Sequence, residues 1–292
     1  MADHCICCGG KHLAAAPAVL MPFISKRVFD YDLITIDDGF GLNDLHPGAA
    51  YMLCKSIQCQ DCSVIFLNIR FSDEQMHSLY SGYRDEQYVQ QRLSFEPSYS
   101  GVINHFSTRE SYISDVEKWL KSYLPENPAV LDWGGGSGIN TVFLGKSSKI
   151  EVLDPSDAPL VEGALRADLD KQCSNPYDLI ACCQVLEHVP YPTYVLKQIR
   201  EVMKPATLLY VEVPLENFMF DHKDDSQAYL FKKHWHEHIN FFSEKSMISL
   251  ICASGFSIID STVISIDVGW KKSRVMGFLL QLFNENASGH PS

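Results

Sequence analysis

The stretch that decides the fold is VLDWGGGSG, residues 130–138, in which a short apolar segment runs into glycines. Ala129 to Trp133 predicts a buried strand, and the glycine run ends it. Because glycine has no Cβ, such a run lets the backbone turn sharply and come close to a ligand. A glycine run alone is also typical of an ordinary tight turn, so the interpretation depends on the segments that follow.

Three further signals follow the glycines at informative distances. A second apolar segment, KIEVLD, ends at Asp154, about 20 residues on, where a nucleotide ribose needs an acceptor for its hydroxyls. Asp168 and Leu169 come next, and then YDLIACCQVLEHV at residues 177–189. From Ala129 onward, strand patterns alternate with helix patterns, which predicts an α/β fold with a parallel sheet covered by helices on both faces.

The four segments in this order resemble the class I, Rossmann-like methyltransferases that depend on S-adenosylmethionine. That family has an acidic glycine loop, an acid after the second strand, an Asp-Leu pair before the fourth strand and a VLEHV segment after it. The loop differs from the dinucleotide fingerprint GxGxxG, because Asp132 precedes the glycines. A carboxylate there would repel a pyrophosphate and would suit the ammonium group of a methionine, which argues against NAD.

The resemblance assigns a donor-binding role to one set of residues. They are Asp132, Gly134, Gly135 and Gly136 for the methionine portion, Asp154 for the ribose, Pro155, Asp168 and Leu169 for the adenine, and Gln184 for the sulfonium. In this family the histidine of the VLEHV segment, here His188, often orders its loop without doing chemistry.

Two cysteine pairs predict a zinc site near the amino terminus. Each pair has the CxxC spacing of a zinc knuckle, and the four residues are Cys5, Cys8, Cys59 and Cys62. Four thiolates can close a tetrahedral zinc site and leave no open position for water, so we expect the zinc ion to be structural. Cys7 and Cys54 are alternative ligands, and a further alternative is that all of these are reduced, buried cysteines without a metal.

Composition and periodicity divide the chain into four parts. Apolar residues at helical spacing between Ser111 and Leu124 predict an amphipathic helix before the glycine-loop strand. Tyrosines in the preceding segment either line a substrate cleft or pack between helices, and they are Tyr80, Tyr83, Tyr88, Tyr99 and Tyr112. The predicted parts are a zinc-binding module at 1–70, a helical linker or substrate lid at 71–126, the S-adenosylmethionine-binding domain at 127–268, and a C-terminal helix with a disordered tail at 269–292.

The second half of the chain carries further helix and strand signals. Residues 191–203 have one apolar face and end at a Lys-Pro pair, which predicts a helix. Residues 207–213 predict the next strand, and residues 256–266 predict one or two late strands. Between them, Ser243 is placed to cap a helix that Gly255 would terminate.

The acceptor side is expected at KKHWHEHINFFS, residues 232–243, where three histidines alternate with a tryptophan and a glutamate. Imidazole has an unperturbed pKa of about 6.5, so it can take a proton near neutral pH. Alternation along a strand would also put His234, His236 and His238 on one face, which is an alternative metal site. Methyl transfer from a sulfonium needs no metal, and we therefore favour a proton-transfer role.

This segment resembles the YHEHxxYFS segment of deoxysugar-nucleotide C-methyltransferases, which also carry a four-cysteine zinc module before the methyltransferase domain. The resemblance matches Glu237 and His238 to the acid and the base that removes a proton next to a sugar ketone, and it adds His236 to the candidate catalytic group. Trp235 stands where that family has a catalytic tyrosine. We expect the chain to lack that family's C-terminal domain, so the resemblance covers the amino-terminal two-thirds of its architecture.

The composition is that of an ordinary globular protein with an acidic surface. The formal net charge is −12, which disfavours generic binding to nucleic-acid phosphates or anionic lipid. No apolar run approaches the roughly 20 residues of a spanning helix, and residues 13–23 lack the basic leader of a signal peptide. Ten cysteines in a cofactor-dependent chain fit a reducing cytoplasm. We expect a cytoplasmic protein without a nucleic-acid or membrane partner.

The sequence therefore predicts an enzyme that transfers a methyl group from S-adenosylmethionine to a small-molecule acceptor, with a sugar or sugar-nucleotide as the expected class. His238 would be the base, and Glu237 would orient it or share its proton. One alternative is an O- or N-methyltransferase of another small metabolite, in which the histidines only position a hydroxyl or an amine. Another is a non-catalytic zinc-module adaptor that binds S-adenosylmethionine or a protein partner.

Overall fold

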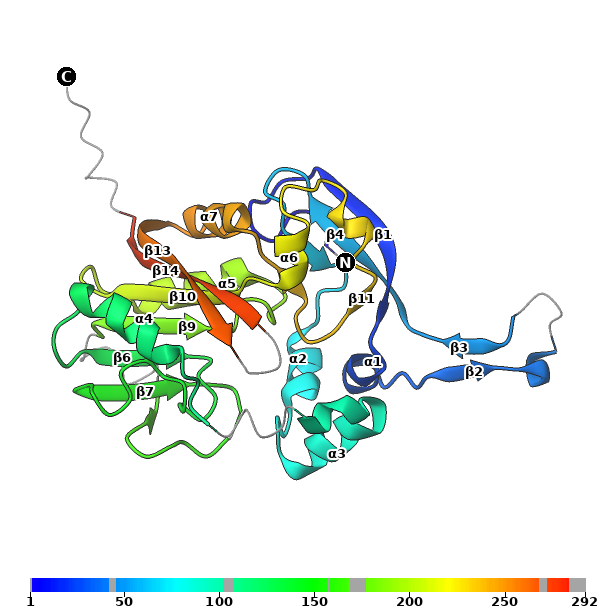
Figure 1. Ribbon diagram of the computed structural model, residues 1–292, viewed down its shortest axis with the longest axis horizontal. Helices are drawn as coiled ribbons and strands as arrows, with labels where there is room; N and C mark the ends of the chain where they lie inside the picture. The colour runs from blue at the N-terminus through cyan, green and yellow to red at the C-terminus, as the bar shows by residue number, and fades with distance from the viewer. Residues whose placement is uncertain are drawn as a thin grey trace, which may run out of the picture.

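The computed structural model describes residues 2–41, 46–101, 108–156, 158–168, 177–267 and 272–283. These residues form a seven-stranded sheet, a five-stranded sheet and a two-stranded hairpin (Figure 1). Two expectations lie outside the described residues, namely the adenine contact of Leu169 and the disordered end of the tail.

The seven-stranded sheet is built around the strand that precedes the glycines. Its order is β13-β14-β10-β9-β6-β7-β8. Strands β6 to β10 are parallel, and β14 is antiparallel to both of its neighbours. The strands are β6 (Ala129–Trp133), β7 (Lys149–Leu153), β8 (Leu165–Arg166), β9 (Leu179–Cys183), β10 (Leu208–Pro214), β13 (Phe256–Asp267) and β14 (Lys272–Leu282). The predicted α/β fold is confirmed.

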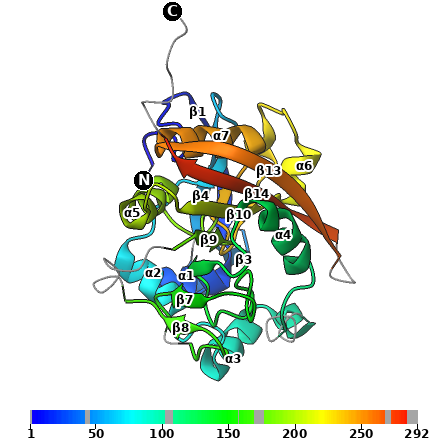
Figure 2. The same ribbon diagram turned by 90° about the vertical axis from the view of Figure 1, so that its left-hand side faces the viewer.

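Helices cover both faces of this sheet, because side chains alternate along each central strand. Val130 packs in one core with helix α4 (Ile113–Leu120). Leu131, the next residue, packs in another core with helices α5 (Pro192–Val202) and α7 (Glu244–Ala253). Figure 2 shows α4 and α5 on opposite sides of the sheet. The helices that the sequence predicted before the glycine loop and after the VLEHV segment are therefore observed.

The predicted caps of α7 are confirmed in atomic detail. The Ser243 Oγ accepts the backbone N–H of Ser246 at 3.1 Å, and the Ser243 N–H donates to the Ser246 Oγ at 2.9 Å. This reciprocal pair satisfies two backbone groups that the first turn of a helix leaves unpaired. Gly255 follows the helix with φ of 81°, a left-handed conformation in which glycine carries no steric cost.

The predicted helix at 269–283 is wrong, because β14 runs through Lys272–Leu282 as a strand between β10 and β13. The segment contains the apolar run VMGFLL, and successive residues are buried on opposite faces of the sheet. Leu279 packs with the α4 core, whereas Leu280 packs with the α5 and α7 core. A strand buried on both faces has no polar side, so its hydrophobic pattern does not differ from that of a buried helix.

The five-stranded sheet joins the amino-terminal segment to the histidine-rich segment. Its order is β11-β1-β4-β5-β12. Strand β11 pairs in parallel with β1, and β12 pairs antiparallel with β5. The strands are β1 (Leu13–Leu20), β4 (Leu53–Cys59), β5 (Ile65–Leu67), β11 (His234–Trp235) and β12 (Asn240–Phe241). The segment predicted to bear the catalytic histidines therefore supplies both edge strands of the amino-terminal sheet.

The remaining elements lie mostly before the seven-stranded sheet in the chain. The two-stranded hairpin projects from the body of the molecule (Figure 1). In the ranges that the structure describes, no helix combines the length and the apolarity needed to cross a bilayer. The elements are α1 (Pro22–Phe29), β2 (Ile34–Ile36), η1 (Asp38–Phe40), β3 (Gly48–Ala50), α2 (Asp73–Tyr80), α3 (Glu86–Phe95), η2 (Pro97–Gly101), η4 (Lys121–Tyr123), α6 (Asn217–Asp221) and η6 (Ala228–Leu230).

Candidate active site

A cavity of about 700 Å³ lies at the carboxyl ends of the parallel strands, the edge at which open α/β sheets bind ligands. Its lining includes seven of the nine predicted donor residues, which we call the donor set: Asp132, Gly134, Gly135, Gly136, Asp154, Pro155 and Gln184. Its lining also includes acids and histidines from other elements, which we call the acceptor set: Glu187, His188, Glu216, Glu237 and His238. One cavity therefore holds both predicted halves of the site.

The glycine loop has the close contacts that only glycine allows. Gly134 has φ of 79°, and a Cβ added there would lie 2.5 Å from Cγ2 of Val185. A Cβ on Gly135 would lie 2.3 Å from the Asp132 carboxylate. The Gly136 N–H donates to Oδ2 of Asp154 at 2.8 Å, so the loop after β6 is tied to the acid after β7. The glycine run is therefore a packed turn against the cavity.

The two donor-set carboxylates differ in their surroundings. Asp132 is buried and accepts a hydrogen bond from the Thr141 hydroxyl at 2.5 Å. Burial raises the pKa of Asp132 to about 6, although the hydrogen bond from Thr141 opposes the shift. Asp154 is half-buried, and its Oδ1 accepts the backbone N–H of Ser156 at 2.8 Å. Asp154 therefore presents a carboxylate at the cavity wall while it also organises the surrounding loops.

Gln184, at the tip of β9, is held by a buried glutamate that the sequence did not predict as part of the site. Its Nε2 donates to Oε1 of Glu212 at 2.9 Å, and its backbone has a left-handed φ of 57°. Glu212 also accepts the hydroxyls of Tyr112 at 2.8 Å and Tyr210 at 2.6 Å. Burial raises the pKa of Glu212. The only sequence signal for this network is a glutamate inside the apolar strand LLYVEVP.

Asp168 does not stand with the donor set. It is exposed, and the lining of the cavity in the described ranges does not include it. Its predicted contact with the adenine amino group is therefore an expectation that the geometry leaves unsupported.

Glu237 is a buried ion-pair partner. Its Oε1 accepts the Tyr88 hydroxyl at 2.5 Å, and its two oxygens receive Nη1 of Arg92 at 3.1 and 3.2 Å. Burial opposes ionisation, but His236 and Arg92 outweigh it and lower the pKa of Glu237. Glu237 is therefore held as a carboxylate by the helical segment, through residues of α3.

His238 has a different acid as its partner. Its Nδ1 lies 2.5 Å from Oε1 of Glu216, a residue that follows β10 and that the sequence reading missed. Burial lowers the basicity of His238, but the carboxylates of Glu216 and Glu187 outweigh burial and raise its pKa. An ionised carboxylate only accepts hydrogen bonds, so Nδ1 carries a proton, and Nε2 has a lone pair whenever the ring is neutral. The neutral form of His238 is thus a candidate for proton removal through Nε2.

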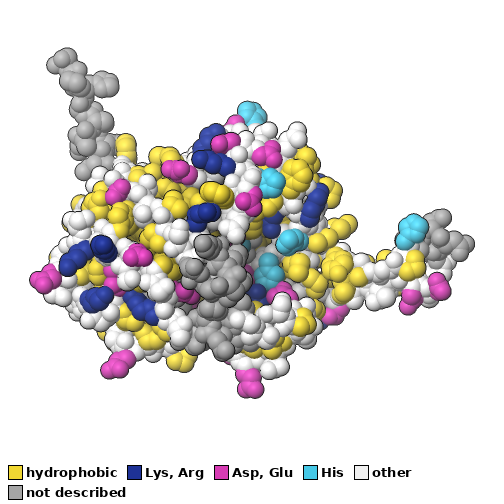
Figure 3. Space-filling view, viewed as in Figure 1, with side chains coloured by type: hydrophobic (Ala, Val, Ile, Leu, Met, Phe, Trp, Pro, Cys, Tyr) yellow, Lys and Arg dark blue, Asp and Glu magenta, His cyan; other side chains and the backbone are white. Residues whose placement is uncertain are grey.

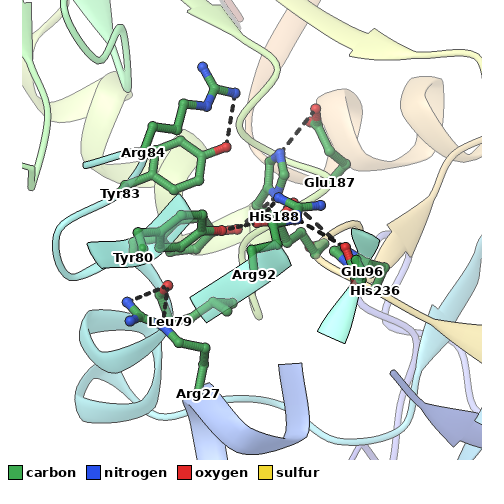
Figure 4. A network of polar contacts seen from close by, with 12 residues as sticks. Arg27, Leu79, Tyr80, Tyr83, Arg84, Arg92, Glu96, Glu187, His188 and His236 are labelled. Atoms are coloured by element: carbon green, nitrogen blue, oxygen red, sulfur yellow. Dashed lines mark hydrogen bonds and ion pairs between the residues drawn. The ribbon is translucent and has the colours of Figure 1, made fainter. Parts of the chain in front are cut away.

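His188 stands beside His238, with their ring centroids 4.6 Å apart in an edge-to-face arrangement. Its Nδ1 lies 2.8 Å from the Tyr80 hydroxyl and 3.2 Å from the backbone carbonyl of Glu237. The carbonyl only accepts hydrogen bonds, whereas the Tyr80 hydroxyl can donate or accept, so the contact with the carbonyl favours the tautomer with the proton on Nδ1. Burial lowers the pKa of His188 to about 3. Figure 4 shows His188 between Tyr80 and Glu187.

Glu187 is the unusual member of the acceptor set. Its side chain has no exposed area, and neither carboxylate oxygen has a hydrogen-bond partner. The nearest ionisable atom is Nε2 of His188, 3.7 Å from Oε1 (Figure 4). Burial raises the pKa of Glu187 to about 7. Such a group is costly in a folded protein unless a ligand or ion completes its coordination.

The other histidines of the 232–243 segment lie elsewhere. His236 places its Nε2 2.5 Å from Oε1 of Glu96, and it is not among the described residues that line the cavity. His234 is exposed. The alternative metal site of His234, His236 and His238 is wrong for the described residues: the ligand atoms that converge are those of Glu187, His188 and His238.

Trp235 cannot take the place of a catalytic tyrosine, because it points into the core of the five-stranded sheet. Its side chain is fully buried, and its Nε1 donates to the Ser56 hydroxyl at 2.8 Å. Other phenols are available to the cavity from the helical segment, and those that line it are Tyr80, Tyr83, Tyr99 and Tyr112. The cleft interpretation of the tyrosines is therefore favoured for these four.

The predicted cysteines meet at one point, at the turn between β4 and β5. The Cys5 and Cys62 sulfurs lie 3.5 Å apart, the Cys8 and Cys59 sulfurs lie 3.7 Å apart, and all four lie within 4.8 Å of one another. A tetrahedral zinc ion with metal–sulfur bonds of about 2.3 Å separates its ligands by about 3.8 Å. The four thiols therefore fit a zinc ion, and neither Cys7 nor Cys54 belongs to the converging group.

The surface around the site is mixed in charge. On the face shown in Figure 3, lysine and arginine side chains alternate with acidic ones, and histidines lie among hydrophobic side chains.

The parallel sheet, its glycine loop and the acid after the second strand define a class I methyltransferase that uses S-adenosylmethionine. A family model described as "Methyltransferase domain" matches residues 104–261, more than half of the 292 residues. The chain belongs to this family and is an S-adenosylmethionine-dependent methyltransferase.

Two solved structures illustrate how far the likeness extends. One is a 1,6-didemethyltoxoflavin-N1-methyltransferase from Burkholderia thailandensis with bound 1,6-didemethyltoxoflavin and S-adenosylhomocysteine. It is 15% identical, with a TM-score of 0.49, over 77% of this chain and 97% of that chain. The other is an S-adenosylmethionine-dependent methyltransferase from Clostridium acetobutylicum, 13% identical with a TM-score of 0.43, over 66% of this chain and 99% of that chain.

Proposed function

We propose that this methyltransferase acts on a small polar acceptor of the sugar or sugar-nucleotide class, and that His238 removes the acceptor's proton. The observation that carries the proposal is the single cavity that holds both the donor set and the acceptor set. The resemblance of residues 234–243 to the deoxysugar-nucleotide C-methyltransferases supports the acceptor class. S-adenosylmethionine supplies an electrophilic methyl carbon when it is bound.

The chain's own residues would divide the work as follows. The lone pair on Nε2 of His238 takes the proton as the acceptor atom forms its bond to the methyl carbon and the sulfur–carbon bond breaks. Glu216 holds Nδ1 of His238 and stabilises the imidazolium that results. Arg92 and Tyr88 fix Glu237, which keeps the adjacent His238 in place. His236 would support this arrangement through Glu96.

The helical segment would supply the wall of the acceptor site. It brings Tyr80 to His188, Arg92 to Glu237, and Tyr83, Tyr99 and Tyr112 to the cavity lining. This placement supports the proposal that residues 71–126 form a substrate lid. The proposed zinc module at 1–70 shares its five-stranded sheet with residues 234–241, which supply the two edge strands.

A panel of acceptors tests the acceptor class. We expect methyl transfer from labelled S-adenosylmethionine to at least one keto- or hydroxy-sugar nucleotide, with none to bulk protein or nucleic acid. NMR of the product locates the methyl group on carbon, oxygen or nitrogen, and a carbon-bound methyl supports the C-methyltransferase interpretation. Turnover confined to an unrelated small metabolite would contradict the sugar assignment while leaving the methyltransferase assignment intact.

Replacing Asp154 with alanine is expected to weaken S-adenosylmethionine binding by about 1–3 kcal/mol, the range for the loss of a charged hydrogen-bond acceptor. The variant also removes the acceptor of the Gly136 N–H, which acts in the same direction. Calorimetric titration measures the change. Glu162→Ala is the matched control, because Glu162 is exposed and outside the cavity lining. Equal affinities in the two variants would remove Asp154 from the proposed ribose site.

A further inference from the structure

We propose that Glu187, His188 and His238 bind one divalent transition-metal ion at the acceptor side of the cavity, in addition to the cysteine site. One ligand atom from each residue lies within 4.8 Å of the other two. All three residues line the cavity. Two imidazoles and one carboxylate are a ligand set that suits zinc, cobalt or nickel, and three protein ligands leave further positions open to the cavity.

The unpaired carboxylate of Glu187 is the first independent support for this site. Both of its oxygens are buried and lack a hydrogen-bond partner. A buried carboxylate that only stabilises the fold normally accepts hydrogen bonds, and neither oxygen of Glu187 has a partner in hydrogen-bond geometry. A bound cation would complete its coordination and offset the free-energy cost of burying it.

The hydrogen bonds of the two histidines are the second support. Nδ1 of His238 lies 2.5 Å from the Glu216 carboxylate, and Nδ1 of His188 lies 3.2 Å from the Glu237 carbonyl and 2.8 Å from the Tyr80 hydroxyl. Metal-binding histidines almost always donate their second ring N–H to a carboxylate or a carbonyl, which fixes the tautomer and orients the ring. In the neutral ring with its proton on Nδ1, each residue has a lone pair on Nε2. The two neighbouring imidazoles thus have the hydrogen-bonding arrangement of metal-binding histidines.

The spacing requires little movement to accept a metal ion. A tetrahedral site with metal–ligand bonds of about 2.0–2.1 Å separates its ligand atoms by about 3.4 Å. Oε1 of Glu187 and Nε2 of His188 are already 3.7 Å apart. The third ligand atom, on His238, lies within 4.8 Å of both, so it would have to approach them by at most about 1.4 Å.

A bound ion would stop the proposed chemistry, and this consequence rests on the proposed function. The metal takes the lone pair on Nε2 of His238, which is the same pair that would accept the proton. Metal binding and proton removal therefore exclude each other. The site would make methyl transfer sensitive to free transition-metal ions. Zinc bound to the four cysteines would not affect methyl transfer in this way.

Metal titration tests the site without any measurement of activity. The probe is Co²⁺ added to the zinc-loaded full-length protein and followed by visible absorption and calorimetry. We expect one further equivalent per chain, with weak ligand-field bands and no thiolate charge-transfer band, because no sulfur is among the ligands. Binding of no further equivalent, or binding with a thiolate band, would overturn the proposal.

Variants identify the ligands. Glu187→Gln keeps the side-chain volume and should abolish the further equivalent, and His188→Ala should do the same. Glu216→Gln should weaken Co²⁺ binding about 10–100-fold, the usual effect of losing a residue that orients a ligand. His234→Ala is the control, since that histidine is exposed and outside the cavity, and it should bind Co²⁺ as the wild type does. Retention of the further equivalent by Glu187→Gln would overturn the assignment.

Activity is then a separate readout. On any acceptor that the enzyme methylates, Co²⁺ or Zn²⁺ should inhibit at the concentrations that fill the spectroscopic site, and a chelator should reverse the inhibition. If the ion binds and turnover persists, His238 is not the base, and the metal site stands while the proposed function falls. If no ion binds and His238 is still required for turnover, the metal site falls while the proposed function stands.

Discussion

Replacing His238 with alanine is expected to lower kcat about 10²–10⁴-fold, the usual contribution of a positioned general base. The imidazole carries a lone pair on Nε2 and faces the cavity, and Glu216 holds its other nitrogen. The dissociation constant for S-adenosylmethionine should stay nearly unchanged, because the donor set lies on other segments of the chain. Steady-state kinetics on an identified acceptor, together with calorimetry for the donor, measure the two effects.

The matched control for this variant is His234→Ala. His234 is a histidine of the same segment that is exposed and does not line the cavity, so its loss should change kcat little. Trp235 cannot compensate for His238, since an indole N–H only donates and this one is bonded to Ser56. Near-normal turnover by His238→Ala would place the base elsewhere and remove the main support for the C-methyltransferase interpretation.

The double variant Cys59→Ser, Cys62→Ser is expected to lose about one zinc ion per chain and to unfold at a lower temperature than the wild type. Binding of zinc to four thiolates contributes roughly 10–16 kcal/mol to the folding of small zinc modules. Here the thiols join the amino terminus to the β4–β5 turn, so their loss frees both. Elemental analysis of protein purified without chelator and thermal melting measure the outcome.

Two single-cysteine controls sharpen the zinc prediction. Cys252→Ser alters an exposed cysteine, and Cys54→Ser alters a buried cysteine outside the converging group; both should keep their zinc. Loss of zinc from Cys54→Ser would make Cys54 a ligand after all. Zinc retained by the double variant, or no stoichiometric zinc in the wild type, would show that the four thiols serve another purpose.

The backbone turns and helix ends around the donor set were predictable because their signals are local. A glycine that needs left-handed φ, such as Gly134, and a serine that caps a helix, such as Ser243, act within a few residues of their position. The cysteines were predictable because their spacing repeats. Strand β14 was not, because a segment buried on both faces loses the periodicity that separates a strand from a helix.

The acceptor half depends on contacts between distant segments, which no local pattern encodes. Glu216 meets His238 only because β10 ends beside the 234–241 segment, and Tyr80 meets His188 across more than a hundred residues. Glu187 was visible in the VLEHV segment, but its lack of partners is a property of the folded interior. The sequence therefore indicated which residues are chemically suited to the acceptor side, but it did not indicate which partners they contact.

The five-stranded sheet also bears on how the protein emerges from the ribosome. Strands β1, β4 and β5 are synthesised early, but both outer strands of the sheet come from residues 234–241. At about 5–20 residues per second, translation would leave two open strand edges for on the order of ten seconds or more after β5 appears. During that interval the nascent chain exposes unpaired backbone groups that can join other strands. A zinc ion already clamped to the four thiols would hold those early strands together, so metal supply during synthesis should govern how much of the enzyme reaches its native state.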